Sequence, residues 1–253
     1  MAAFERVFPQ DWAPLVLTMK ICVIIPMYNE ENIAKNSVMT TMSYIKQIPD
    51  PVTLAVVNDG SKDKTEIILQ QLLGEFDHDQ YRLITYPVNR GYGGALKAGI
   101  KFAVDNHYDY VVFMDSDLTN HPKYLKDFYE KMLQGYDYIK ASRYMKGGGG
   151  KGVPFKRVII SRMGNILAKC IMRLPLTDFT NGFRAVKVSL LKQIDLKENS
   201  YPLMVEELKK ASRLTNNFCE IPNILETRSV AAGKSKFKYN AVTFWKYIKY
   251  LFV

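Results

Sequence analysis

The sequence is poor in cysteine, and this excludes several classes of protein. Its 253 residues contain three cysteines, Cys22, Cys170 and Cys219, which lie far apart and form no CxxC pair. A disulfide-stapled secreted domain and a thiolate metal site are therefore disfavoured. We expect reduced, mostly buried thiols in a cytosolic protein.

The sequence also lacks a long hydrophobic run. No window reaches the roughly 20 apolar residues that a membrane-spanning helix needs. Residues 1–20 contain acidic residues and prolines where a secretory signal would have a basic start and an unbroken apolar stretch. We therefore expect no export signal, an N-terminal extension over residues 1–20, and a protein that is soluble or peripheral to a membrane.

Acidic residues are in the minority. The 25 aspartates and glutamates face 35 lysines and arginines, which gives a formal charge of +10 and an isoelectric point near 9.3. This balance favours an anionic partner, such as nucleic acid, an acidic membrane surface or a phosphorylated substrate. An apolar fraction of 47% excludes a disordered or fibrous chain, and the length fits one large domain.

Short apolar runs alternate with amphipathic segments along the chain. This alternation predicts βαβ units and an α/β fold with a mostly parallel sheet flanked by helices. Glycines in KGGGGKG, residues 146–152, predict a mobile loop, and residues 182–253 mix short strands with two helices. The expected strands are 21–26, 53–58, 82–86, 110–115 and 138–142, and the expected helices lie near 31–47, 63–75, 93–106, 123–134 and 155–173.

The segment YVVFMDSDL, residues 110–118, is the most informative one, because a buried strand delivers Asp115 and Asp117 at its end. Residues two apart on a strand share a face, and ligands of parallel sheets bind beyond the carboxyl ends of the strands. Neighbouring carboxylates repel each other unless a cation or a proton offsets their charge. The pair therefore predicts a divalent cation that holds a phosphorylated substrate.

Polar segments also follow the three preceding strands. They are PMYNEEN at 26–32, NDGSKDKT at 58–65 and NRGYGGALKAG at 89–99. Taken alone, the first two are typical of loops, turns and helix caps. The third combines glycines with Arg90 and Lys97 at a helix start, which is typical of an anion-binding cradle.

In their order along the chain, these segments resemble the inverting family 2 glycosyltransferases, from Ile21 to about Phe237. The resemblance implies a GT-A fold with a Rossmann-like sheet over residues 21–237 and a nucleotide-sugar donor at the strand ends. It also implies that Asp115 and Asp117 form a DxD motif that holds Mg²⁺ or Mn²⁺ against the diphosphate. The residues that it implies for nucleotide-sugar binding are Pro26, Tyr28, Asn29, Glu30, Asp59, Gly60, Ser61, Arg90, Gly91, Lys97, Asp115, Ser116, Asp117, Arg228 and Lys236.

The second half of the chain narrows the resemblance to the polyprenyl-phosphate glycosyltransferases, the group of dolichol-phosphate mannose synthase. The matching segments are SRY (142–144), KRVIISRMGN (156–165), TDFTNGFRAV (177–186), CEIP (219–222) and GKSKF (233–237). The similarity implies that Arg143, Arg157 and Ser161 hold the phosphate of the acceptor lipid. Asp178 would touch the sugar or balance an arginine. Arg157 and Ser161 are four residues apart, so they share one face of a helix.

A lipid acceptor accounts for the lack of an obvious general base. A lipid monophosphate is largely ionised at neutral pH, so the nucleophile needs no deprotonation. The enzyme then has to neutralise charge and align the reactants, and the expected catalytic residues are Asp117, Arg143, Arg157, Ser161 and Asp178. The expected reaction moves mannose from GDP-mannose to a polyprenyl (dolichyl) phosphate with inversion. Transfer of glucose from UDP-glucose is the nearest alternative.

The sequence departs from the family pattern at three places. Asn58 replaces the aspartate that is common before Asp59, and Thr119 stands where relatives offer glutamine or serine near the metal. The segment ETRSVAAGKSKF, residues 226–237, separates Arg228 from Gly233 by two more residues than expected. This spacing weakens the case for a diphosphate-binding role of Arg228.

The carboxyl end, residues 238–253, predicts an amphipathic helix that mixes aromatic residues with lysines. Such a helix suits a membrane interface, although it could instead dock on the domain. A protein bound to the cytosolic face of a membrane, with or without a membrane-anchoring subunit, fits these features. We expect no nucleic-acid partner.

Two other classes of protein fit parts of the sequence. DSDLT matches the DxDxT signature of haloacid-dehalogenase-type phosphatases, in which Asp115 would be the nucleophile and Asp117 the acid/base. Those enzymes carry a further acidic metal pair, which the sequence does not show. A basic binding module without catalysis would bind RNA or anionic lipid without needing either aspartate.

Overall fold

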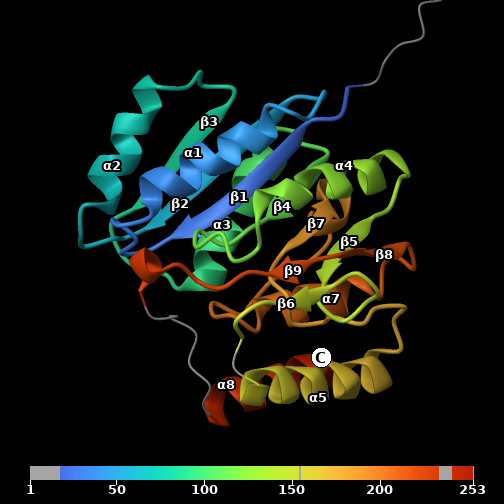
Figure 1. The fold of residues 1–253 in the computed structure, drawn as a ribbon. Coiled ribbons are helices and arrows are strands. Elements are labelled where there is room, and N and C mark those ends of the chain that lie inside the picture. Colours follow the sequence, from blue (N-terminus) through green and yellow to red (C-terminus); the bar gives the residue numbers. More distant parts are fainter. Residues whose placement is uncertain (1–17, 154, 234–240, 253) are drawn as a thin grey trace, which may run out of the picture.

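A seven-stranded mixed sheet in the order β3-β2-β1-β4-β7-β5-β8 lies at the centre of the molecule (Figure 1). The structure, a computed structural model, describes residues 18–153, 155–233 and 241–252. Neighbouring strands run parallel except at β7, which is antiparallel to both β4 and β5. The strands are β1 (Ile21–Met27), β2 (Val52–Asp59), β3 (Tyr81–Tyr86), β4 (Tyr110–Phe113), β5 (Tyr138–Ser142), β7 (Arg184–Lys187) and β8 (Phe218–Pro222). The predicted mostly parallel sheet is confirmed.

Helices cover both faces of the sheet, which explains why its central strands are continuous apolar runs. Along β1, Ile21 and Val23 pack toward one face, whereas Cys22 and Ile24 pack toward the other. The first face is covered by α1 (Ala34–Ile45), α2 (Thr65–Gln71) and α4 (Leu125–Leu133). The second face is covered by α3 (Tyr92–Asp105), α6 (Val188–Leu191) and α7 (Leu203–Ala211). Three short 3₁₀ segments lie at Leu72–Gly74, Pro122–Tyr124 and Val230–Ala232.

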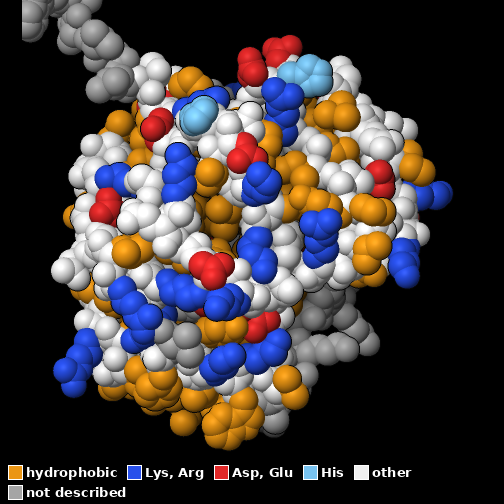
Figure 2. All heavy atoms as spheres, turned by 180° about the vertical axis from the view of Figure 1, so that it is seen from behind, with side chains coloured by type: hydrophobic (Ala, Val, Ile, Leu, Met, Phe, Trp, Pro, Cys, Tyr) orange, Lys and Arg blue, Asp and Glu red, His pale blue; other side chains and the backbone are white. Residues whose placement is uncertain are grey.

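Two further helices, α5 (Phe155–Met172) and α8 (Ala241–Phe252), lie side by side at one end of the molecule (Figure 1). Helix α8 buries Tyr250 and Leu251 in the same core as α3 and α7, so it docks on the domain. Its Phe244 and Trp245 remain 55% and 66% exposed. Seen from behind, hydrophobic side chains gather at this end, next to a band of lysines and arginines (Figure 2).

Two local expectations are corrected by the structure. Within KGGGGKG, the short strand β6 (Gly149–Gly150) pairs with β9 (Ile224–Leu225), so this glycine run is part of a two-stranded ribbon. All three cysteines are free, but only Cys22 is buried, and Cys170 on α5 is exposed.

Among the described residues, no helix combines the length and hydrophobicity needed to cross a bilayer.

Candidate active site

A cavity of about 1240 Å³ opens at the carboxyl ends of β1, β2 and β4 and extends to α5 and α8. The residues at the strand ends are mostly polar, and those from the two helices are mostly apolar. The first group includes Tyr28, Glu30, Asp59, Asp115 and Asp117. The apolar members of the second group include Ile160, Met163, Leu167, Phe244, Tyr247, Ile248 and Leu251. The cavity is therefore amphipathic, with its charged groups at the edge of the sheet.

The two expected metal ligands, Asp115 and Asp117, both line the cavity, and neighbouring donors orient them. The Tyr92 hydroxyl donates to Asp115 Oδ1 at 3.1 Å. The Thr119 hydroxyl donates to Asp117 Oδ1 at 2.8 Å, and Arg228 Nη1 donates to Asp117 Oδ2 at 2.6 Å. Thr119 thus holds the second aspartate in place, a role that its position in the sequence did not reveal.

The negative charge of this carboxylate pair is compensated only in part, by the contact between Arg228 and Asp117. Burial, together with the nearby charge of Asp117, raises the pKa of Asp115 to about 6. A divalent cation would remove this penalty, and carboxylate oxygens are the ligands that Mg²⁺ and Mn²⁺ accept. In the described part of the chain, no three histidine, cysteine or acidic side chains converge on one point. Two carboxylates would leave coordination positions open to oxygen atoms of a ligand, so the donor set fits such a cation.

The polar segments after β1 and β2 hold each other in place. The backbone N–H of Asn29 donates to Ser61 Oγ at 3.0 Å, and the N–H of Lys62 donates to Asn29 Oδ1 at 2.7 Å. Gly60 has a φ of 69°, and a Cβ there would lie 2.6 Å from the backbone nitrogen of Asn89. Among these predicted nucleotide-binding residues, Asn29, Gly60 and Ser61 shape the loops and do not line the cavity.

Asn58 and Asp59, at the end of β2, have different tasks. The amide of Asn58 is fully buried, donates to Glu66 Oε2 and accepts from the N–H of Ser61. Asn58 therefore stabilises the turn. Asp59 lines the cavity, burial raises its pKa, and its Oδ1 accepts from the N–H of Arg90 at 2.9 Å.

The expected anion cradle before α3 is present only in part. Gly91 lines the cavity with a φ of 82°. The guanidinium of Arg90 instead lies 3.8 Å from the centre of the Tyr86 ring. The ammonium of Lys97 donates to Asn199 Oδ1 at 2.5 Å and anchors a distant loop. The structure therefore does not bring Lys97 to the cavity wall, contrary to our expectation.

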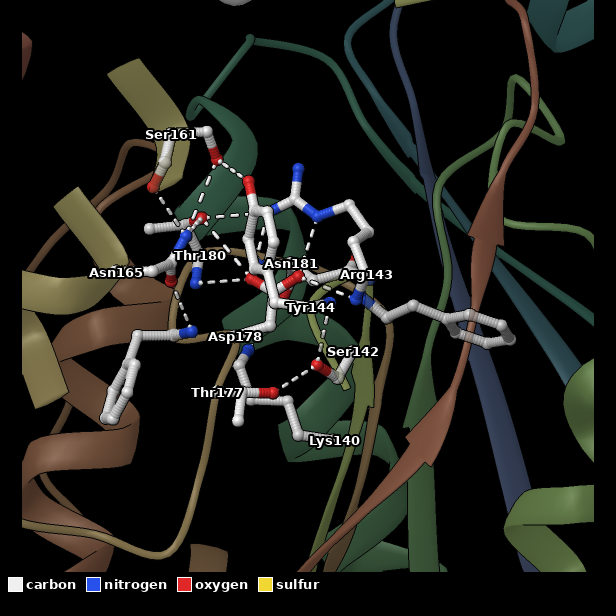
Figure 3. A network of polar contacts seen from close by, with 12 residues as sticks. Lys140, Ser142, Arg143, Tyr144, Ser161, Asn165, Thr177, Asp178, Thr180 and Asn181 are labelled. Atoms are coloured by element: carbon white, nitrogen blue, oxygen red, sulfur yellow. Dashed lines mark hydrogen bonds and ion pairs between the residues drawn. The ribbon is translucent and has the colours of Figure 1, made fainter. Parts of the chain in front are cut away.

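Arg143 lines the cavity and forms a two-point ion pair with Asp178 (Figure 3). Its Nε donates to Asp178 Oδ2 at 2.6 Å, and its Nη2 donates to Asp178 Oδ1 at 2.9 Å and to the Thr180 hydroxyl at 2.9 Å. Burial alone would raise the pKa of Asp178, but the charge and hydrogen bonds of Arg143 hold it below its ordinary value. Of the two roles expected for Asp178, the geometry favours the balancing of an arginine.

A polar network ties helix α5 to the loop that carries Asp178 and Thr180 (Figure 3). The Tyr144 hydroxyl donates to Ser161 Oγ at 2.8 Å, and Asn165 Nδ2 donates to the Thr180 hydroxyl at 3.2 Å. Ser161 therefore lies at the cavity wall near Arg143, as expected. The side chain of Arg157, one turn earlier in α5, and all of Lys236 lie outside the described residues.

Sequence reasoning missed several buried groups beneath the cavity. Lys140 is fully buried, donates to the carbonyl of Asn181 at 2.5 Å, and burial lowers its pKa to about 7. Arg184 and Glu207, both fully buried, form an ion pair with an Nη2–Oε2 distance of 2.7 Å. The motif TDFTNGFRAV contains Arg184 but gives no signal that it is buried.

An aromatic pair next to the carboxylates also escaped prediction. Tyr92 stacks on Tyr201 with ring centres 4.5 Å apart and ring planes 20° apart. Both rings line the cavity next to Asp115. The glycine-rich segment that contains Tyr92 is typical of anion binding, and nothing in it signals a stacked ring.

The model of the family described as Glycosyl transferase family 2 matches residues 22–195. The chain belongs to this family. The polyprenol monophosphomannose synthase of Mycolicibacterium smegmatis is 26% identical over 228 residues, which cover 89% of this chain and 84% of that protein. The undecaprenyl-phosphate mannosyltransferase of Micrococcus luteus is 28% identical over 219 residues, or 85% of this chain and 87% of that protein.

Solved structures agree on the fold. The chain is similar to glucosyl-3-phosphoglycerate synthase from Mycobacterium tuberculosis in complex with Mn²⁺, UDP-glucose and phosphoglyceric acid. The TM-score is 0.66 at 19% identity, with 92% of this chain and 78% of that chain covered. Its complex with Mg²⁺ and UDP gives a TM-score of 0.61 at 21% identity, with coverages of 90% and 74%. The predicted GT-A fold is confirmed, and this family 2 protein is a glycosyltransferase, which displaces the phosphatase and binding-module alternatives.

Proposed function

We propose that this family 2 glycosyltransferase transfers mannose from GDP-mannose to a polyprenyl phosphate, with inversion at C1 of the sugar and with Mg²⁺ or Mn²⁺ at Asp115 and Asp117. One observation carries the proposal: a single cavity joins a carboxylate pair at the strand ends to an apolar wall made by α5 and α8. The carboxylate pair is suited to a sugar diphosphate with its cation, and the apolar wall is suited to a lipid. The names of the two curated relatives, which specify mannose and polyprenyl phosphates, support the same donor sugar and acceptor.

The two ends of the cavity are linked by the loop that precedes β7. A Cβ on Gly182 would lie 3.4 Å from Asp115 Oδ2, so this loop reaches the carboxylate pair. Two residues earlier, Thr180 accepts from Arg143 and from Asn165 on α5. A phosphate held by Arg143 and Ser161 would therefore lie near a donor held at Asp115. This arrangement supports attack of the lipid phosphate on the sugar.

The residues of the chain would divide the work as follows. Tyr28, Glu30 and Asp59 would bind the nucleoside at the ends of β1 and β2. Arg143 and Ser161, with Arg157, would hold the acceptor phosphate, which arrives already ionised and needs no base. A bound divalent cation would supply positive charge to the leaving diphosphate. Holding two anionic phosphates in one place is the main task of such a site, so its cationic groups account for most of the catalysis.

The surface around α5 and α8 supports a position at a membrane. Exposed apolar side chains on the two helices form a cluster, with lysines and arginines nearby (Figure 2). Four of them, Ile160, Met163, Leu167 and Phe244, also line the cavity. Apolar side chains with neighbouring cations suit the interface of an anionic bilayer. The cytosolic face would match free thiols, and an anchoring subunit could use the same surface. The cluster comprises Ile159, Ile160, Met163, Ile166, Leu167, Val242, Phe244, Trp245 and Phe252.

Incubation of the protein with labelled nucleotide sugars, polyprenyl phosphate vesicles and Mg²⁺ or Mn²⁺ tests the proposal. We expect labelled sugar to pass into the organic phase with GDP-mannose, and to a much smaller extent with UDP-glucose. Chelation by EDTA should stop the transfer. If no donor yields organic-extractable sugar under any of these conditions, the proposed acceptor is wrong.

Replacing Arg157 by alanine should mainly weaken use of the lipid acceptor. A charge-assisted hydrogen bond to phosphate contributes about 1.5–3 kcal/mol, so the acceptor KM should rise by about tenfold or more. The donor KM should change little. Arg162, which is exposed on the same helix, provides a matched control in Arg162→Ala. Initial rates measured against acceptor concentration would remove Arg157 from the site if both variants behaved like the parent enzyme.

A further inference from the structure

We propose that Arg228 competes with the metal ion for Asp117 and thereby makes metal binding depend on the donor diphosphate. The inference rests on the proposed function, because it concerns the cation at the same two carboxylates. It assigns to Arg228 a role in the order of binding, in addition to any contact with the donor.

The contacts of Arg228 place a positive charge on the metal-binding carboxylate. Its Nη1 lies 2.6 Å from Asp117 Oδ2, and its Nη2 lies 3.9 Å from Glu30 Oε1. Both members of the short pair are largely buried, with side chains 21% and 12% exposed.

The segment around Arg228 is fastened next to the carboxylates. The N–H of Glu226 donates to the carbonyl of Thr119 at 2.8 Å, within the loop that carries the aspartates. Lys123 adds an ion pair to Glu226 at 3.1 Å. The guanidinium also donates from Nη2 to the carbonyl of Ala232 at 2.8 Å. Arg228 is therefore anchored where it meets Asp117.

These contacts have opposite consequences for metal alone and for metal with a diphosphate. A cation that binds without a nucleotide must take Asp117 Oδ2 from Arg228 and leaves two positive groups close together, which repel. A diphosphate brings negative oxygens that can pair with both the cation and the guanidinium. Arg228 should therefore weaken the binding of the cation alone and strengthen its binding together with a diphosphate. Because such coupling is reciprocal, the metal should raise nucleotide affinity by the same factor.

Titration of Mn²⁺, followed by the electron paramagnetic resonance signal of the free ion, tests this competition without any turnover. In the parent protein, GDP or UDP should raise the Mn²⁺ affinity. In Arg228→Met, the Mn²⁺ affinity without nucleotide should rise by roughly three- to tenfold, because a partly buried ion pair no longer has to be broken. The enhancement by nucleotide should shrink in the same variant. Arg228→Gln, which removes the charge but keeps a polar group, should behave alike.

A matched control is Lys123→Met, which removes the ion pair between Lys123 and Glu226 without touching Asp117. Its Mn²⁺ affinity should equal that of the parent, and Asp117→Asn should lose Mn²⁺ binding. Thermal unfolding in EDTA checks that each variant is folded. If the arginine variants bind Mn²⁺ alone no more tightly than the parent, the competition is refuted while the proposed function stands. If the parent binds no Mn²⁺ with either nucleotide, both the metal role and this inference fail.

Discussion

Replacing Asp117 by asparagine will abolish sugar transfer and leave the protein folded. The amide keeps an oxygen that can accept from the N–H of Thr119, which donates to Asp117 Oδ1 at 3.1 Å, so the loop can retain its shape. It loses the negative charge that a divalent cation needs as a ligand. We expect the rate of transfer to fall by about a thousandfold, since electrostatic stabilisation is usually the largest catalytic term.

The variant should be compared with Glu130→Gln, which removes one acidic charge from an exposed position on α4. Formation of organic-extractable sugar gives the rate, and circular dichroism with thermal unfolding shows whether the fold is intact. The control should keep full activity. Full activity in Asp117→Asn would contradict the metal role and, with it, the assignment of the DSD segment.

Five of the seven strands of the sheet could be located from the sequence, because the central strands are buried on both faces. The other two, β7 and β8, were expected only as short strands somewhere within residues 182–253. Strands buried on both faces are continuous apolar runs, and β5 was predicted with its observed bounds, 138–142. The carboxylate pair could be predicted for the same reason, since a run that ends in DSD places its polar residues at the sheet edge. The division of the chain into a glycosyltransferase domain over residues 21–237 and a C-terminal amphipathic helix over residues 238–253 remains a prediction.

The partners of long side chains could not be predicted from sequence. The lysine of α3, Lys97, is five residues from Tyr92, but its ammonium reaches Asn199, on a loop more than a hundred positions away. Asp178 was expected to meet a sugar or an arginine, and only the fold brings Arg143 within 2.6 Å of it. Contacts between residues so far apart in the sequence depend on how strands and loops pack. The local sequence pattern around each residue does not indicate them.

Buried charges were missed for a related reason. Charged residues are rarely buried unless they are paired, so a single arginine or lysine in a sequence is expected to lie at the surface. Arg184 occupies β7 between two antiparallel neighbours, and Glu207 reaches it from α7. The sequence around Arg184 or Glu207 does not predict their pairing, because only the packing of the helix on the sheet brings the two residues together.

Breaking this buried pair should cost far more stability than breaking an ion pair at the surface. Glu207 accepts from Arg184 Nε and Nη2, both at 2.7 Å, and from the Tyr138 hydroxyl at 2.9 Å. In Glu207→Gln the guanidinium stays charged and buried without a counter-charge. We expect the free energy of unfolding to fall by about 3–5 kcal/mol, measured by urea denaturation. Asp105→Asn, which breaks an exposed pair with Lys101, should change the free energy of unfolding far less.

A double variant separates stability from function at this position. In Arg184→Met with Glu207→Leu neither member of this buried pair keeps a charge, so much of the lost stability should return. Arg184 Nη1 also donates to the carbonyl of Gly182 at 2.8 Å, in the loop that reaches Asp115. That hydrogen bond is absent in the double variant, so transfer should remain well below the parent rate although the protein is stable. Recovery of both stability and rate would mean that the pair serves the core alone, whereas recovery of stability alone would assign it to the support of the carboxylate pair.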